Sequence, residues 1–180
     1  MEMTGEQLIA LPQQAVWEAL NDPDVLKQCI PGCESVERQS ESEFTMVMVA
    51  AVGPVKAKFT GKLTIQDSNP PDSYALAFEG SGGVAGFGKG RAEVSLTQES
   101  DTVTMLSYRA NATVGGKIAQ VGSRLIDGVA RKLADAFFER FNQIVAAPPD
   151  GEEEAPAEDA ADKPARRWAW FGRHKPARAE

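Results

Sequence analysis

The sequence contains few of the side chains from which metal sites are built. Its 180 residues include one histidine, His174, and two cysteines, Cys29 and Cys33. A structural zinc site takes four Cys or His ligands, more than these residues supply at one place. We therefore expect no metal site and no cofactor, and we interpret the two cysteines as small residues flanking the Pro31-Gly32 turn.

Candidate catalytic side chains are equally scarce. General acid–base catalysis requires an ionisable group positioned in a pocket. The faces predicted below to point inward offer Met, Phe, Leu, Val, Ala and Gly, and Tyr74 and Tyr108 are their only phenols. Tyrosine at a strand end more often packs than reacts. No catalytic residue is predicted, and we expect a protein that is not an enzyme.

Long hydrophobic runs and a signal peptide are also lacking. The longest uncharged stretch, residues 44–55, is 12 residues long and contains Gly53 and Pro54, whereas a membrane-spanning helix needs about 20 apolar residues. The first residues, MEMTGEQL, carry acids where a signal peptide carries basic residues. We therefore expect a cytosolic protein whose two thiols are reduced.

Positive charge is in deficit overall but is unevenly placed. The net charge is -7, which argues against binding of nucleic acid phosphates. Residues 146–164 hold seven acids and Lys163, whereas residues 165–180 hold five basic residues and Glu180. Such segregation at one end predicts an interaction tail.

Hydrophobic periodicity predicts an α+β fold. A strand is expected at residues 2–11, a helix from Pro12 to Pro23 and a short helix at 24–30, because proline favours the first turn of a helix. Apolar and polar residues then alternate, which is typical of strands with one buried face. The predicted strands are 44–52, 59–66, 74–79, 88–97 and 102–114, with a bulge between Met105 and Leu106.

Residues 117–145 are predicted to form one long helix with an apolar stripe that includes Leu125, Val129 and Leu133. We expect a curved antiparallel sheet to wrap around this helix and leave an apolar cavity between them. Flexible methionines in that cavity would suit an adaptable apolar ligand, although each could equally be ordinary core. The predicted cavity residues are Met46, Met48, Phe59, Leu63, Phe78, Phe87, Met105, Leu125, Val129, Leu133 and Phe137.

The glycine-dense run at residues 80–90 raises the question of a phosphate-binding loop. It lacks the Gly-Lys-Ser/Thr ending, because Gly90 follows Lys89, and no helix is predicted after it. We interpret it as a flexible hairpin. A further hypothesis is that Phe87 on this hairpin gates the cavity.

Several short motifs follow the order found in a known family. They are Pro23-Asp24-Val25-Leu26, Ile30-Pro31-Gly32-Cys33, Gly53-Pro54-Val55, Phe59-Thr60-Gly61, Pro70-Pro71, Gly86-Phe87-Gly88-Lys89-Gly90, Gly115-Gly116-Lys117 and Gly122-Ser123-Arg124. Over residues 1–145 the chain resembles the carbon monoxide dehydrogenase G-subunit family, within the helix-grip (START or Bet v 1-like) superfamily. The resemblance implies a helix-grip fold with an internal ligand cavity. It also implies a role in attaching a molybdenum hydroxylase of the carbon monoxide dehydrogenase type to the cytoplasmic membrane.

The C-terminal residues predict a tether and a membrane-binding tail. Residues 146–164 are rich in Ala, Pro, Glu and Asp, the composition of a disordered linker. In residues 165–180 aromatic side chains are flanked by cationic ones, which favours binding at an anionic lipid surface. A docking role on a partner protein, or no role, are the alternatives. The predicted membrane-binding residues are Arg166, Arg167, Trp168, Trp170, Phe171, Arg173 and Lys175.

These expectations combine into one functional hypothesis. The protein would be a peripheral protein of the inner face of the cytoplasmic membrane that recruits the hydroxylase and carries a quinone or another isoprenoid lipid in its cavity. A cavity enzyme of the cyclase or hydrolase type is one alternative, and an assembly factor for the hydroxylase is another.

Overall fold

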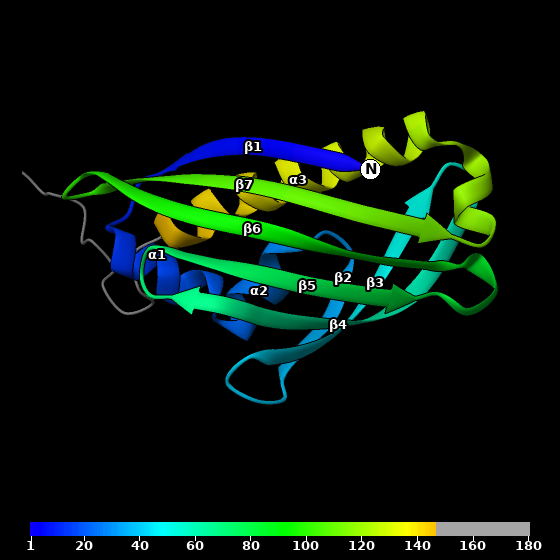
Figure 1. Ribbon diagram of the computed structural model, residues 1–180, viewed down its shortest axis with the longest axis horizontal. Coiled ribbons are helices and arrows are strands. Elements are labelled where there is room, and N and C mark those ends of the chain that lie inside the picture. Colours follow the sequence, from blue (N-terminus) through cyan, green and yellow to red (C-terminus); the bar gives the residue numbers. More distant parts are fainter. Residues whose placement is uncertain (147–180) are drawn as a thin grey trace, which may run out of the picture. The chain divides into compact units, whose positions relative to one another are not determined.

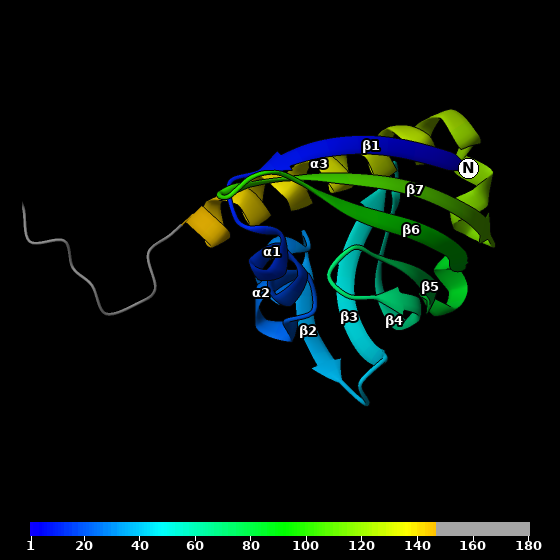
Figure 2. The same ribbon diagram turned by 60° about the vertical axis from the view of Figure 1, so that its left-hand side comes forward.

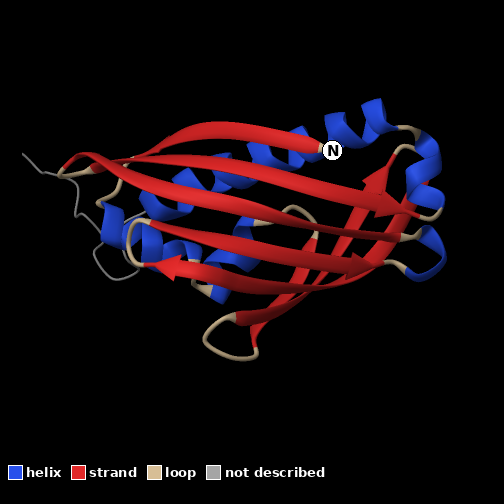
Figure 3. Ribbon diagram, viewed as in Figure 1, coloured by secondary structure: helices blue, strands red, loops and turns tan. Residues whose placement is uncertain are grey.

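The computed structural model describes residues 1–146, which form one sheet and three α-helices (Figures 1 and 3). Ala146, which composition alone assigns to the linker, is the last residue of the C-terminal helix. The rest of the predicted acidic linker and the whole basic tail at 165–180 lie outside the described residues, so the domain limits stay predictions.

The sheet is antiparallel, and its seven strands follow the order β1-β7-β6-β5-β4-β3-β2. Strands β2 to β7 form a meander, and the last strand, β7, pairs with the first, β1, which forms one edge of the sheet. Figure 2 shows how strongly the sheet curves. The strands are β1 (Glu2–Ile9), β2 (Cys33–Arg38), β3 (Glu43–Val52), β4 (Val55–Asn69), β5 (Ser73–Ser81), β6 (Phe87–Ser100) and β7 (Val103–Gly115).

Helices α1 (Gln13–Leu20) and α2 (Pro23–Cys29) connect β1 to β2. The Asp22 carboxylate caps α2 by accepting a hydrogen bond of 2.8 Å from the Asp24 amide, and Pro23 occupies the first turn, where its missing N–H costs nothing. The long α3 (Ser123–Ala146) runs along the hollow of the sheet (Figure 2). The predicted helix-grip arrangement is therefore confirmed.

The periodicity did not predict β2, and it placed one bulge wrongly. Strand β2 carries mostly charged and polar residues around the buried Val36, so its alternation is weak. Strand β7 pairs with β1 and β6 without interruption through Met105 and Leu106. The register shift between β6 and β7 lies instead between Gln98 and Ser100, beside the hairpin turn, where an extra residue disrupts the fewest hydrogen bonds between the strands.

The predicted helix 117–145 is divided in two. Residues Lys117–Val121 form a short 3-10 helix, η2, and α3 begins at Ser123. Between them Gly122 has φ +97, a left-handed conformation that an α-helix cannot contain and that glycine adopts most readily.

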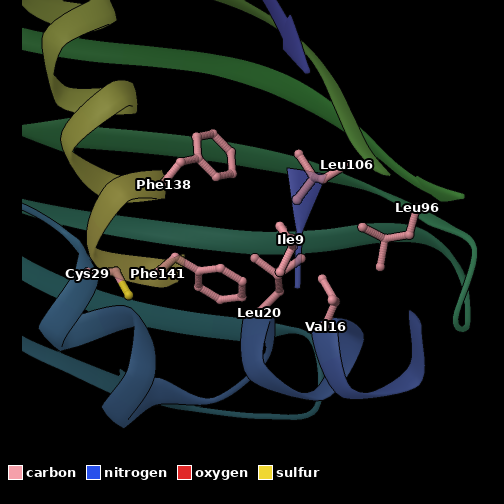
Figure 4. Packing of buried hydrophobic residues seen from close by; sticks show 8 residues of the cluster. All are labelled: Ile9, Val16, Leu20, Cys29, Leu96, Leu106, Phe138 and Phe141. Atoms are coloured by element: carbon pink, nitrogen blue, oxygen red, sulfur yellow. The ribbon is translucent and has the colours of Figure 1, made fainter. Parts of the chain in front are cut away.

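A cluster of buried hydrophobic residues lies between the C-terminal half of α3, helices α1 and α2, and the neighbouring ends of β1, β6 and β7 (Figure 4). Phe141 and Ile9 are fully buried there, and Phe138 stacks on Tyr108 with ring centroids 5.4 Å apart. Fully burying one such side chain contributes about 1.5–3 kcal/mol. The buried part of α3 is therefore centred on Phe138 and Phe141, whereas Leu125 of the predicted stripe is 40% exposed.

Candidate functional site

An apolar cavity of about 300 Å³ lies between the centre of the sheet and the helices. The sheet contributes side chains from six of its strands, because alternate residues of each strand face inward. The α-helices and the turn after α2 close the other side. From the sheet come Met3, Phe44, Met46, Leu63, Ile65, Tyr74, Leu76, Ala92, Val94, Leu106, Tyr108 and Ala110, and from the helical side Leu20, Leu26, Ile30, Phe137 and Phe138.

Small side chains in the middle of the sheet help to create this space. Ala92 of β6 and Ala110 of β7 are directly paired, and Ala92 is also paired with Leu76 of β5. A sheet and the layer packed on it lie about 10 Å apart, so two adjacent alanines leave room that leucines would fill. The volume is at the lower end of the range for small-molecule sites.

Within residues 1–146, no Asp, Glu, Lys, Arg or His lines the cavity. Its polar groups are two phenols, and within the same residues neither hydroxyl makes a hydrogen bond. Burial raises the pKa of Tyr74 to about 12. Burial, and then the nearby Asp135 carboxylate, raise the pKa of Tyr108. Both phenols are therefore neutral at physiological pH and able to donate a hydrogen bond to a ligand.

Three of the predicted cavity residues, Met46, Leu63 and Phe137, line the cavity. Three more predicted residues face inward but lie outside the cavity lining, toward the β3–β4 turn and the β5–β6 connection. They are Met48 of β3, Phe59 of β4 and Phe78 of β5. Val129 and Leu133 precede Phe137 on α3 at four-residue spacing and are half-buried outside the lining.

The other three predicted residues lie elsewhere. Met105 faces the outer side of the sheet, because the ladder continues unbroken to Leu106, which faces inward. Phe87 is 46% exposed at the start of β6, and Leu125 is exposed on the first turns of α3. Phe87 does not line the cavity, so its role as a gate stays a hypothesis.

Sequence reasoning missed the contributions of β1 and α2 to this site. Met3 lines the cavity from the edge strand, and Leu26 and Ile30 close it from the helical side. The available signal was the four-residue spacing of Leu26 and Ile30. The alternation in β1 is weak, because Thr4 and Gly5 follow Met3.

The largest surface depression, about 750 Å³, lies on the outer face of the sheet. It is lined by exposed charged residues such as Lys62, Glu79 and Arg91 and is open to solvent, so it offers an apolar ligand no shelter. In the described part of the chain, no group of three or more His, Cys, Asp or Glu residues could hold a metal ion. None of the helices in residues 1–146 has the length and apolarity to cross a bilayer.

Both cysteines are free thiols. Cys29 is fully buried, and this burial raises its pKa to about 11, an effect that Arg140 partly opposes. The Cys33 thiol donates to the Ser35 carbonyl oxygen at 3.4 Å, and burial raises its pKa as well. A thiol with a raised pKa is a poor nucleophile, so these residues have a structural role.

Known structures share this architecture. A conserved protein from Geobacillus kaustophilus is 33% identical, with a TM-score of 0.76 over 81% of this chain and 95% of its own. A START superfamily protein from Mycobacterium smegmatis shares the fold at 10% identity, with a TM-score of 0.63 over 80% of this chain and 96% of its own. The Zhui aromatase/cyclase from Streptomyces sp. R1128 shares it at 15% identity, with a TM-score of 0.60 over 81% of this chain and 93% of its own. No curated protein sequence matches the chain.

Residues 5–146 match the CoxG family, described as the G subunit of carbon monoxide dehydrogenase. The match spans nearly all the described residues, including every cavity-lining residue except Met3. The chain therefore belongs to the CoxG family.

Proposed function

We propose that this protein is a non-enzymatic accessory protein that binds a respiratory quinone or another isoprenoid lipid in its cavity. In this role it recruits a molybdenum hydroxylase of the carbon monoxide dehydrogenase type to the cytoplasmic membrane. The observation that carries the proposal is the cavity itself, which combines an apolar wall with two neutral phenols and no charged side chain among the described residues.

A quinone suits these properties. Its ring and isoprenoid chain are apolar, and each CH₂ group removed from water contributes about 0.8 kcal/mol. Its carbonyl oxygens accept hydrogen bonds, which the hydroxyls of Tyr74 and Tyr108 can donate. A cavity of about 300 Å³ accommodates a head group and the first part of a chain, so the rest of a long chain would extend beyond the lining.

The cavity gives little support to the alternative of a cyclase or hydrolase. Those reactions require a general acid or base within reach of the substrate, and the phenols are held in their protonated form. The aromatase/cyclase from Streptomyces is 15% identical, a likeness that extends to the fold alone. The assembly-factor alternative predicts inactive hydroxylase in cells that lack this protein, whereas recruitment predicts active enzyme in the soluble fraction.

Ligand binding is tested with the purified full-length chain. Organic extraction and mass spectrometry should recover a quinone or isoprenoid lipid, and added ubiquinone or menaquinone should bind. Ala92→Phe places a ring in the cavity and should abolish both, whereas Ala77→Phe adds the same ring on the outer face of the adjacent strand and should change neither. Absence of any lipid, together with no binding of added quinone, would remove the ligand proposal.

Recruitment is tested by sedimenting purified hydroxylase with inner-membrane vesicles. The full-length chain should increase the sedimented fraction of hydroxylase, and deletion of residues 165–180 should reduce it if the basic tail binds lipid. High salt should weaken the interaction, because it screens the cationic side chains. An unchanged fraction after the deletion would contradict the membrane role of the tail.

A further inference from the structure

One end of the domain is built from the tips of three hairpins or connections, and we call it the loop-tip end. It comprises residues 52–58, from the end of β3 into β4, residues 82–89, from the 3-10 helix η1 (Gly83–Ala85) into β6, and residues 116–125, from η2 into α3. Figure 1 shows these connections together at the right-hand end of the sheet.

Close backbone approaches hold these segments together. A Cβ atom added at Gly116 would lie 2.5 Å from the Gly86 Cα, so the second and third segments are in contact. A Cβ atom added at Gly53 would lie 2.8 Å from Leu125 Cδ2, which brings the first segment against the start of α3. The loop-tip end is therefore a continuous surface.

This surface exposes large apolar side chains. Val84 is 85% exposed, Phe87 46% and Leu125 40%. Within residues 1–146 the only other large apolar side chains that are exposed are Met1 and Leu8, at the N-terminus and in the edge strand β1. Val84 and Phe87 lie on the β5–β6 connection and the start of β6, and Leu125 lies beside Gly53, so all three belong to segments of this end.

Basic residues predominate at the loop-tip end. Its three segments contain no Asp or Glu and carry five basic residues, Lys56, Lys58, Lys89, Lys117 and Arg124. Lys58 pairs with Glu34 at 2.8 Å, and within residues 1–146 the other four make no salt bridge. Asp127, one turn into α3, is the nearest acid along the chain, and Glu79 of β5 lies directly across the ladder from Lys89 of β6.

The opposite end of the sheet is acidic. Asp67 lies near the end of β4 and Asp72 in the β4–β5 turn, and Glu99 lies near the end of β6 and Asp101 in the β6–β7 turn. Arg91 of β6 pairs with Asp67 at 2.6 Å, and the other three acids make no salt bridge within residues 1–146. Basic residues therefore predominate at the loop-tip end and acidic residues at the opposite end of the sheet.

We propose that the loop-tip end docks on an anionic lipid surface, with Val84, Phe87 and Leu125 entering the headgroup region and the surrounding lysines and Arg124 contacting lipid phosphates. Segments that combine exposed apolar side chains with a predominance of cations match such a surface in both polarity and charge. The acidic end points away from the lipid, which avoids repulsion. This docking surface belongs to the folded domain and does not depend on the basic tail.

The inner face of the sheet leads from the loop-tip end to the cavity. Three inward-facing side chains lie between the cavity and the loop-tip end, one or two inward-facing positions beyond the cavity residues of the same strand. They are Met48 of β3, Phe59 of β4 and Phe78 of β5. These side chains are half-buried and apolar. A lipid leaving the bilayer at the loop-tip end would thus meet an apolar surface as far as the cavity, which extends the proposed function.

The test measures binding of full-length protein to vesicles of phosphatidylcholine with and without phosphatidylglycerol. Tail binding is suppressed in every sample by changing all seven predicted membrane-binding residues of the tail to alanine, namely Arg166, Arg167, Trp168, Trp170, Phe171, Arg173 and Lys175. The protein should still bind the phosphatidylglycerol vesicles. Lys117→Glu with Arg124→Glu should weaken this binding at least about 25-fold, because each cation contributes about fivefold, and Val84→Asp should weaken it several-fold.

Matched controls exclude general effects of charge and exposure. Lys27→Glu reverses a cation on α2 and is compared with Lys117→Glu alone, so that the net charge changes equally, and Leu8→Ser removes an exposed leucine from β1. Both controls should leave binding unchanged. Equal binding by the loop-tip variants and these controls would overturn the proposal, as would no binding by the tail-substituted protein. Either result leaves quinone binding in the cavity unaffected, because that is measured without vesicles.

Discussion

The two ends of this domain are built on opposite principles. At the packed end, Phe138 and Phe141 of α3 meet α1, β1 and β7 in a cluster from which water is excluded. At the loop-tip end, the same helix begins with an exposed Leu125, and the neighbouring loops expose Val84 and Phe87. One helix therefore stabilises the fold with its C-terminal half and leaves its N-terminal half available for contacts with other molecules.

This difference explains how a small domain can keep an apolar cavity and remain folded. The free energy of folding comes mainly from tightly packed side chains, and these lie together at one end. The residues around the cavity and at the loop-tip end pack less tightly and stabilise the fold less. The aromatic cluster at the packed end offsets this loss. Mutations at the two ends should accordingly affect stability very differently.

The largest effect should separate the two halves of α3. Phe141→Ala leaves a cavity in the packed end and should lower the free energy of unfolding by about 3–5 kcal/mol. Leu125→Ala removes a side chain that is 40% exposed and should lower it by less than about 1 kcal/mol. Urea denaturation followed by circular dichroism measures both values. Similar losses would contradict the division of α3 into a stabilising and an accessible half.

The second effect tests how firmly the β5–β6 loop is held. Gly86 has φ +119, and an added Cβ would lie 2.1 Å from the Gly115 carbonyl oxygen, whereas Gly83 has φ +61 with nothing within 4 Å. Gly86→Ala should cost about 3 kcal/mol and Gly83→Ala about 1 kcal/mol. Thermal denaturation compares the two. Equally small losses would show that the loop rearranges easily and would favour the hypothesis that Phe87 acts as a gate.

A smaller effect concerns the polar groups of the cavity. Tyr74→Phe keeps the ring that packs edge-on against Trp17, with centroids 5.3 Å apart, and removes only the hydroxyl. If that hydroxyl donates to a quinone carbonyl, the affinity for added quinone should fall about fivefold, which corresponds to about 1 kcal/mol. Tyr108→Phe gives the matched comparison. Unchanged affinity in both variants would mean that binding depends on apolar contact alone.

The smallest effect is a loss of stability in mild alkali. Burial raises the pKa of Cys29 from 9.0 to about 11 and that of Tyr74 from 10.0 to about 12. The unfolded chain releases these protons at lower pH than the folded protein, so their contribution to stability is complete below about pH 8 and declines as pH rises through 9 and above. The urea midpoint should fall between about pH 8.5 and 10. The decline should be shallower in Cys29→Ala, and an equal slope in both proteins would exclude this cause.

Much of the fold could be predicted because hydrophobic periodicity reports which face of an element is buried. The alternation at residues 59–66 and 88–97 identified strands that the structure contains, and the resemblance to a known family predicted how they enclose the helix. The charged β2 was missed because one buried residue, Val36, makes no pattern.

The cavity was predicted less well, because a period of two identifies the inner face but not how far the space extends along it. Met46 and Phe59 share an inner face, yet only Met46 reaches the cavity. Met105 was assigned to the inner face through a bulge that the continuous ladder with β6 excludes. Position along a strand and exact register depend on pairing partners distant in sequence.

The sequence by itself determined the fold class, the family and the separation of an acidic segment from a basic aromatic tail, because each is encoded in local patterns of polarity and charge. Only the tertiary structure decided that Ala92 and Ala110 meet beneath the helices to leave a cavity, and that three separate segments without acids converge at one end. Both depend on contacts between residues far apart in the chain, which no local pattern records.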